Sequence, residues 1–312
     1  MTVGRFAPSP SGRMHLGNML TALVSWLSAK KDNGKWILRI EDLDRGRSKI
    51  DYARMIEEDL LWLGLDWDEG GIEDKGNHGP YSQSRRSEIY EEALAKIIDT
   101  GLTYPCFCSR ADIAAANAPH ASQNQWIYPG TCLPAKLGGS LRSENINKGR
   151  KPSIRLHLPD KDISFSDRVF GNHTINLSKD FGDIILRRSD GGWAYQMAVV
   201  VDDALMGITE VVRGADLLQS SAVQIHLHKL LGYEPPEFMH VPLLCNEEGI
   251  RLSKRDESLS MEELKKEFSP SHLTGYLAYL CGIIPEPFPI STKGLLPLYS
   301  PTSIKPEQKV IV

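Results

Sequence analysis

The sequence predicts an α/β fold, namely a parallel sheet with helices between its strands, an inserted α+β subdomain, and a short C-terminal helical tail. Three observations predict it. Residues 3–40 show the pattern strand, loop, helix, strand, which implies parallel strands joined by a right-handed crossover. Apolar helices and strands alternate again over residues 193–245. Between these segments, residues 101–180 consist of short strand-like runs and loops, which indicates an insertion.

The first unit starts with a short apolar strand over residues 3–7. Residues 8–12 (Pro-Ser-Pro-Ser-Gly) cannot extend regular structure, because their two prolines lack the backbone N–H donor. Apolar residues then recur at three- and four-residue spacing from Leu16, which predicts a helix, and Gly34 is suited to end it. Residues 36–40 are expected to form the next strand, buried on both faces.

The remaining elements follow from the same periodicities. The expected helices cover residues 51–63, 85–100, 261–268 and 272–282, and the expected strands in and beside the insertion cover residues 102–108, 153–158, 163–165 and 181–188. The sequence thus divides into a sheet domain of residues 1–100 and 181–245, an inserted subdomain of residues 101–180, and a loop with a helical tail over residues 246–312.

The composition is that of a globular chain. Hydrophobic residues make up 41% and charged residues 24%, which excludes a disordered or fibrous protein. The longest apolar runs, such as Met197–Val201, are too short to span a bilayer, so no membrane partner is expected. The net charge of −4 gives no global basic field, although local basic patches are compatible with it. Five cysteines and no signal-peptide pattern indicate a reducing, cytoplasmic location.

The tetrapeptide His15-Leu16-Gly17-Asn18 lies where the first strand gives way to the first helix. Parallel α/β sheets bind phosphates at this place, beside the positive end of a helix. Gly17 lets a ligand approach the backbone, and His15 and Asn18 can donate hydrogen bonds to a phosphate. The same tetrapeptide also fits a glycine-containing turn with a helix-capping Asn. Residues 251–255 (Arg-Leu-Ser-Lys-Arg) suit nucleotide phosphates too, or form a solvated charged turn.

Residues 15–18 after the first strand resemble the HIGH signature of class I aminoacyl-tRNA synthetases. Residues 251–255 resemble the KMSKS signature of that family, with Arg at its first position. Residues 38–44 (Leu-Arg-Ile-Glu-Asp-Leu-Asp) and 199–203 (Val-Val-Val-Asp-Asp) resemble the glutamyl/glutaminyl subclass. The order and separation of these elements fit the family over most of residues 3–255. The resemblance implies a Rossmann-like catalytic domain over the predicted sheet.

The resemblance also implies ATP as a substrate, with Mg²⁺ as its counter-ion. The sequence itself shows no pattern of residues that is typical of a dedicated Mg²⁺ site. His15, Gly17, Asn18 and Lys254 would bind the nucleotide. Of these, His15 and Asn18 would stabilise the pentacovalent phosphate, and Lys254 would stabilise the departing pyrophosphate.

A glutamate site needs cations for two carboxylates and an anion for the ammonium group. Arg5 and Arg213 can supply the cations and Glu41 the anion, because each follows or ends a strand at one edge of the sheet. A structural ion pair of Glu41 with Arg213 is the alternative. The resemblance points to the same three residues and extends the glutamate-binding set to Arg5, Phe6, Ala7, Pro8, Ser9, Glu41, Tyr195 and Arg213.

Three cysteines of the insertion, Cys106, Cys108 and Cys132, indicate a structural zinc site that lacks its fourth ligand. Ligand chemistry alone nominates His120. The pattern Cys-x-Cys, nineteen residues, Tyr-x-x-x-Cys instead resembles the glutamyl-queuosine tRNA(Asp) synthetases, which are truncated paralogues of glutamyl-tRNA synthetase, and this resemblance nominates Tyr128. One Zn²⁺ per chain is expected. Buried free thiols are the alternative.

Only 57 residues follow Arg255, which is too few for the anticodon-binding region of an ordinary glutamyl-tRNA synthetase. The resemblance to the truncated enzymes implies activation of L-glutamate as an adenylate and its transfer to queuosine at the wobble position of tRNA(Asp). The expected protein is thus a monomeric ligase with glutamate, ATP and this tRNA as partners. Two alternatives remain: a truncated enzyme that charges the tRNA 3′ end, and a non-catalytic synthetase-like binding protein.

Overall fold

The structure, a computed structural model, describes the whole chain except residues 110, 114–126, 135–148, 246–258, 308 and 311–312. The predicted first unit is present: strands β1 (Val3–Phe6) and β2 (Lys35–Leu38) are parallel, and helix α1 (Leu16–Lys31) connects them. Most side chains of α1 are buried, because the sheet and further helices both pack against it. Strand β3 (Glu69–Gly70) extends this sheet beside β2.

The second half of the sheet is also parallel. Its elements are helix α7 (Tyr195–Leu205), strand β9 (Glu210–Gly214), helix α8 (Ser220–Leu230) and strand β10 (Glu237–Val241). β9 pairs with β10 and lies beside β1, where the Thr209 amide donates to the Val3 carbonyl oxygen over 2.9 Å. The carboxyl ends of β1, β2, β9 and β10 therefore meet at one edge, which is where such sheets bind ligands.

A hairpin of β6 (Asp162–Asp167) and β7 (Gly171–Asn176) continues this sheet beyond β10. Asp167 is the register partner of Phe238 on β10, and the Arg168 amide donates to the Phe238 carbonyl oxygen over 3.0 Å. The sequence predicts β6 but not β7, whose six residues include one buried side chain and therefore carry little apolar signal.

A separate antiparallel sheet contains β4 (Thr103–Cys106), β5 (Ser153–Leu156) and β8 (Ile184–Arg187), with β5 in the centre. Helix α3 (Ser87–Asp99) leads into it from the parallel sheet. The sequence predicts strands at all three places, each two to four residues longer than observed.

The C-terminal helices pack against α1 and α2 (Ile50–Leu63) in one apolar core. The Ser269 hydroxyl accepts a hydrogen bond from the His272 amide at the start of helix α10 (Pro270–Cys281), and Pro270 occupies the first turn, where no N–H partner is needed. The elements not yet described are α6 (Leu177–Asp180), β11 (Leu244–Cys245), α9 (Met261–Glu267), α11 (Thr292–Leu295) and β12 (Lys309–Val310).

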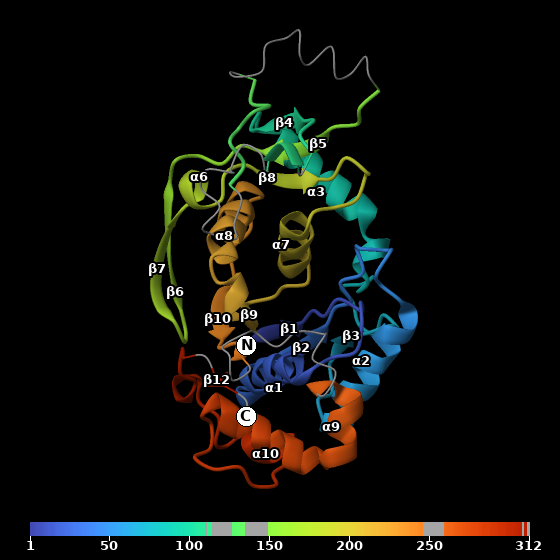
Figure 1. The fold of residues 1–312 in the computed structure, drawn as a ribbon, viewed down its shortest axis with the longest axis vertical. Helices are drawn as coiled ribbons and strands as arrows, with labels where there is room; N and C mark the ends of the chain where they lie inside the picture. The colour runs from blue at the N-terminus through green and yellow to red at the C-terminus, as the bar shows by residue number, and fades with distance from the viewer. Residues whose placement is uncertain (110, 114–126, 135–148, 246–258, 308, 311–312) are drawn as a thin grey trace.

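Figure 1 shows these parts along one long axis, with α9 and α10 at one end and the sheet of β4, β5 and β8 at the other. The parallel strands lie between them, and the β6–β7 hairpin runs along one side. The predicted α/β class with a parallel sheet is confirmed. No helix of the described residues has both the length and the apolarity needed to cross a bilayer.

Candidate functional site

A cleft of about 420 Å³ opens at the carboxyl edge of the parallel sheet. It lies between the ends of β1, β2, β9 and β10 and the first turns of α1 and α7. Every predicted glutamate-binding residue lines this cleft: Arg5, Phe6, Ala7, Pro8, Ser9, Glu41, Tyr195 and Arg213. His15, Gly17 and Asn18 line it too. Lys254 and the rest of residues 251–255 lie outside the described residues.

The first turn of α1 presents hydrogen-bond donors to the cleft. The His15 side chain accepts a hydrogen bond through Nδ1 from the Gly17 amide over 3.1 Å, so in the neutral ring the proton is on Nε2. The Asn18 Oδ1 accepts from the His15 amide over 3.1 Å, which leaves the amide NH₂ group as its donor end. A Cβ on Gly17 would lie 3.1 Å from the His15 ring. The tetrapeptide therefore caps α1 and also lines the cleft with donors.

Three of the buried arginines around the cleft have carboxylate partners. Arg39 Nη1 lies 2.6 Å from Asp203 Oδ1, and Arg39 Nη2 lies 3.0 Å from Glu41 Oε1. Arg5 Nε lies 3.2 Å from the same Asp203 oxygen. Burial tends to raise the pKa of both carboxyl groups. For Asp203, the charges of Arg39 and Arg5 outweigh burial and lower the pKa. For Glu41, burial is the larger effect and raises the pKa. Glu41 is thus paired with Arg39, not with Arg213.

A second set of contacts extends this network toward α3. Asp202 is fully buried and accepts hydrogen bonds from Arg86 Nε over 2.6 Å, from Gln83 Nε2 over 2.8 Å and from the Tyr90 hydroxyl over 2.9 Å. Three arginines, Arg5, Arg39 and Arg86, are therefore balanced by the three carboxylates Glu41, Asp202 and Asp203.

Arg213 is the exception. Its side chain is 5% exposed, and it forms no ion pair with a carboxylate of the described residues. Its hydrogen bonds go to His240, Gln224, Ser221 and the Leu217 carbonyl oxygen, all of which are uncharged acceptors. Burial lowers the pKa of Arg213, as expected for a cation without a counter-ion. A buried cation that lines a cleft in this way is suited to an anionic ligand.

Four buried residues of these networks, Arg39, Asp202, Asp203 and His240, are not among the residues predicted from the sequence. Arg39 and the two aspartates stand within apolar runs, at 36–40 and 197–203, and a charge within such a run is a signal of a buried ion pair. The apolar runs could therefore have identified these three residues as buried charges, but they do not show which charges pair with each other. His240 also stands in an apolar run, at 238–244, so its burial carries the same signal.

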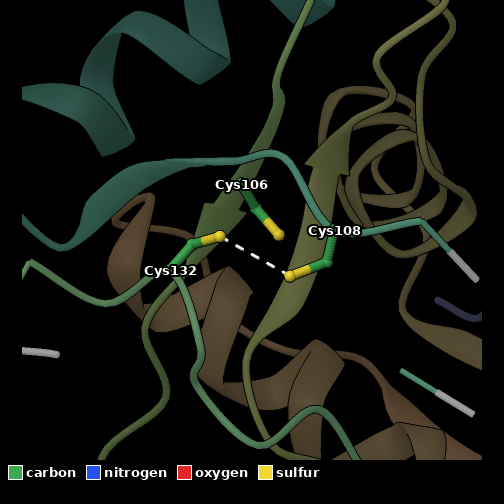
Figure 2. Close-up of side chains that lie close together, drawn as sticks. All are labelled: Cys106, Cys108 and Cys132. Carbon is green, nitrogen blue, oxygen red and sulfur yellow. Dashed lines mark hydrogen bonds between the residues drawn. The ribbon is translucent and has the colours of Figure 1, made fainter. Parts of the chain in front are cut away.

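The second candidate site is the cysteine cluster of the small sheet (Figure 2). The sulfur atoms of Cys106, Cys108 and Cys132 lie within 4.8 Å of one another, and the Cys108 and Cys132 sulfurs are 3.6 Å apart. A tetrahedral Zn²⁺ with bonds of about 2.3 Å holds thiolates roughly 3.8 Å apart. The Tyr128 oxygen lies 3.4 Å from the Cys106 sulfur and 3.8 Å from that of Cys108. His120 lies outside the described residues.

The electrostatics of the cluster favour a cation. Burial, together with Cys106, raises the pKa of Cys108 to about 12, and burial with the Cys106 hydrogen bond raises the pKa of Tyr128. Burial also acts on Cys106, but its hydrogen bonds with Tyr128 and Arg155 lower the pKa of that thiol. A divalent cation would offset the cost of ionising these crowded groups, because metal binding stabilises thiolates. The donor set thus fits Zn²⁺.

A helix whose first turn faces a cleft at the carboxyl edge of a parallel sheet is the arrangement with which α/β proteins bind nucleotides and other phosphates. Residues 1–286 match the family described as tRNA synthetases class I (E and Q), catalytic domain, and the chain belongs to this family. The predicted class I fold and the predicted ligase activity are thereby confirmed.

Curated relatives narrow the comparison. The chain is 46% identical to the glutamyl-Q tRNA(Asp) synthetase of Symbiobacterium thermophilum, over 96% of the chain and 92% of the relative. It is 45% identical to the protein of that name in Nitratidesulfovibrio vulgaris, over 97% and 94%. A crystal structure of a glutamate tRNA ligase from Elizabethkingia meningosepticum, in complex with its amino acid, superposes with a TM-score of 0.85 at 27% identity, covering 100% of this chain and 67% of that one.

Proposed function

We propose that this enzyme activates L-glutamate with ATP and transfers the glutamyl group to queuosine at the wobble position of tRNA(Asp). One observation supports the activation step: Arg213, a buried arginine without a carboxylate partner among the described residues, lines the same cleft as His15 and Asn18. The relatives named glutamyl-Q tRNA(Asp) synthetase, at 45–46% identity over nearly the whole chain, support the choice of tRNA.

In the first step, an oxygen of the glutamate α-carboxylate attacks the α-phosphorus of ATP. The bond to the β-phosphate oxygen breaks, and glutamyl-adenylate and pyrophosphate form. His15 Nε2–H and the Asn18 amide donate to the phosphate oxygens on which charge develops, and Lys254 neutralises the pyrophosphate. Arg213 binds the side-chain carboxylate, Arg5 assists it, and Glu41 receives the ammonium group. Mg²⁺ accompanies the nucleotide.

In the second step, a queuosine hydroxyl attacks the carbonyl carbon of the adenylate and AMP leaves. The mixed anhydride is already activated, so positioning of the hydroxyl dominates the step. Incubation with radiolabelled glutamate, ATP and total tRNA, followed by nuclease mapping, tests this assignment. Label in the anticodon loop of tRNA(Asp) supports it. Label at the 3′ end shows an ordinary glutamate–tRNA ligase instead, and no label shows a non-catalytic protein.

The proposed domain division is a catalytic domain of residues 1–100 and 181–245, a zinc-bearing subdomain of residues 101–180, and a C-terminal part of residues 246–312. Strand pairing crosses these bounds, because β6 and β7 join the catalytic sheet and β8 joins the small sheet. We also propose a monomer. In this division Zn²⁺ is structural: Cys106, Cys108 and Cys132 hold it with Tyr128, away from the cleft.

Lys254→Ala should slow glutamate-dependent exchange of pyrophosphate into ATP by about a hundredfold, the usual cost of one lost transition-state charge contact. The exchange should proceed without tRNA, because the described part of the cleft is already assembled in this chain. The matched control is Lys96→Ala, which removes an exposed lysine on α3 and should leave the rate unchanged. An unchanged rate in the Lys254 variant would remove this lysine from the mechanism.

Metal analysis should give one equivalent of zinc per chain. Tyr128→Phe should retain more zinc than Cys106→Ser, because a phenolate is a harder ligand than a thiolate and costs more to ionise at neutral pH. Cys245→Ser, which changes a buried cysteine outside the cluster, is the control and should retain full zinc content. Full zinc in a Cys106/Cys108 double serine variant would contradict the site.

A further inference from the structure

The Nε atom of Arg213 is bound by an imidazole, where a buried arginine usually meets a carboxylate. His240 is the register partner of Arg213 on the neighbouring strand β10, and its Nε2 lies 3.0 Å from Arg213 Nε. On the other side of the ring, His240 Nδ1 lies 2.6 Å from Asp167 Oδ2 on β6. Three adjacent strands thus carry a chain of three side chains that ends at the cleft.

The order of donors in this chain is fixed by chemistry. A guanidinium can only donate, so His240 Nε2 accepts and carries no proton. The proton of the neutral ring is therefore on Nδ1, where it is donated to Asp167. Asp167 also accepts hydrogen bonds from the backbone amides of His240, Val169 and Phe170, over 3.0, 3.0 and 2.9 Å, and it is fully buried with His240. Burial lowers the pKa of His240, which favours the neutral ring.

The other contacts of Arg213 are uncharged as well. Gln224 Nε2 donates to Gln196 Oε1 over 2.8 Å, which turns its Oε1 toward Arg213 Nη1 at 2.7 Å. Ser221 Oγ accepts from Nη2 over 2.8 Å, and the Phe238 ring lies 5.3 Å from the guanidinium carbon. The described surroundings therefore orient the guanidinium through uncharged groups and a ring face, and they place no carboxylate in hydrogen-bond contact with it.

We propose that His240 is a positioning residue that determines amino-acid specificity. It holds Arg213 by a neutral acceptor and keeps the negative charge of Asp167 one imidazole ring away. The positive charge of Arg213 is thereby kept for the side-chain carboxylate of the substrate. This inference rests on the proposed activation of glutamate and adds the residue that makes the cleft select an acidic side chain.

Two single substitutions at His240 distinguish a role in positioning Arg213 from a role in folding. His240→Leu removes the acceptor and should raise KM for glutamate by roughly ten- to a hundredfold in ATP–pyrophosphate exchange, the usual cost of losing a hydrogen bond to a charged group. KM for ATP and kcat should change less than about twofold. His240→Gln should restore most of the glutamate affinity, since its amide oxygen can accept from Arg213. Equal rises in both KM values, or no rescue by glutamine, would show a structural role and overturn the proposal.

A double variant tests the charge argument itself. His240→Glu with Asp167→Asn keeps the total charge of the trio but moves the carboxylate into contact with Arg213. The preference for glutamate over glutamine should fall at least about tenfold, because Arg213 would then be neutralised. An unchanged preference overturns the proposal. Circular dichroism checks whether the double variant folds. If it does not fold, the comparison of His240→Leu with His240→Gln tests the proposal. A wild-type enzyme without glutamate-dependent exchange would overturn the proposed function itself.

Discussion

Glutamine should be activated about 10⁴-fold less efficiently than glutamate, as measured by kcat/KM in ATP–pyrophosphate exchange. The described partners of Arg213 are all uncharged, so a bound side-chain carboxylate would be its counter-ion. An amide has nearly the same size but carries no charge, and its NH₂ group would face the N–H donors of Arg213. A buried site that is left with an unpaired charge rejects the wrong isostere strongly.

Arg213→Gln provides the companion experiment. It should lower kcat/KM for glutamate by at least about thirtyfold and reduce the preference for glutamate over glutamine, because truncating one partner of a buried charge pair costs at least about 2 kcal/mol. Arg54→Gln, which removes an exposed arginine on α2, is the control and should leave both substrates unaffected. Comparable exchange with glutamate and glutamine in the unaltered enzyme would overturn the assignment of the pocket.

Asp202→Ala should lower the free energy of unfolding by about 3–5 kcal/mol. Asp202 is fully buried, and its two oxygens accept from Arg86, Gln83 and Tyr90. Its removal leaves the buried guanidinium of Arg86 without its counter-ion and breaks the link between α7 and α3. Urea denaturation followed by circular dichroism measures the change.

Asp51→Ala is the matched control for this experiment. Asp51 also pairs with an arginine, Arg54, but the two side chains are 72% and 62% exposed. An exposed pair of this kind contributes little, so the change should stay within about 0.5 kcal/mol. Equal effects of the two substitutions would show that the buried network around Asp202 does not stabilise the fold.

The sequence predicts most of the elements that form the parallel sheet. The strand and helix over residues 3–31 carry strong periodicity, because the buried side chains of α1 pack against the sheet and the C-terminal helices. The pairing of the β6–β7 hairpin with the parallel sheet could not be predicted from local periodicity. Its β6 strand joins β10, a partner about seventy residues away, and no local pattern states which distant strand supplies the hydrogen bonds.

The candidate site, like the fold, could be predicted from the sequence only in part. Residue types and spacing alone nominate His15, Asn18, Arg5, Glu41 and Arg213, and the family resemblance adds Tyr195; all of them line one cleft. The residue types do not reveal their partners, since any of these charges could pair with any other. Only the tertiary structure places Glu41 on Arg39, Arg5 on Asp203 and neutral acceptors around Arg213.

The sequence by itself determined which chemical groups reach the carboxyl edge of the sheet, because strand ends and helix starts are local features. The tertiary structure alone decided which of these groups has no carboxylate partner within the described part of the chain. Pairing depends on distances of a few ångströms between residues on different strands, such as Arg213, His240 and Asp167. In a buried environment, those distances decide whether a charge is neutralised by the protein or left for a ligand.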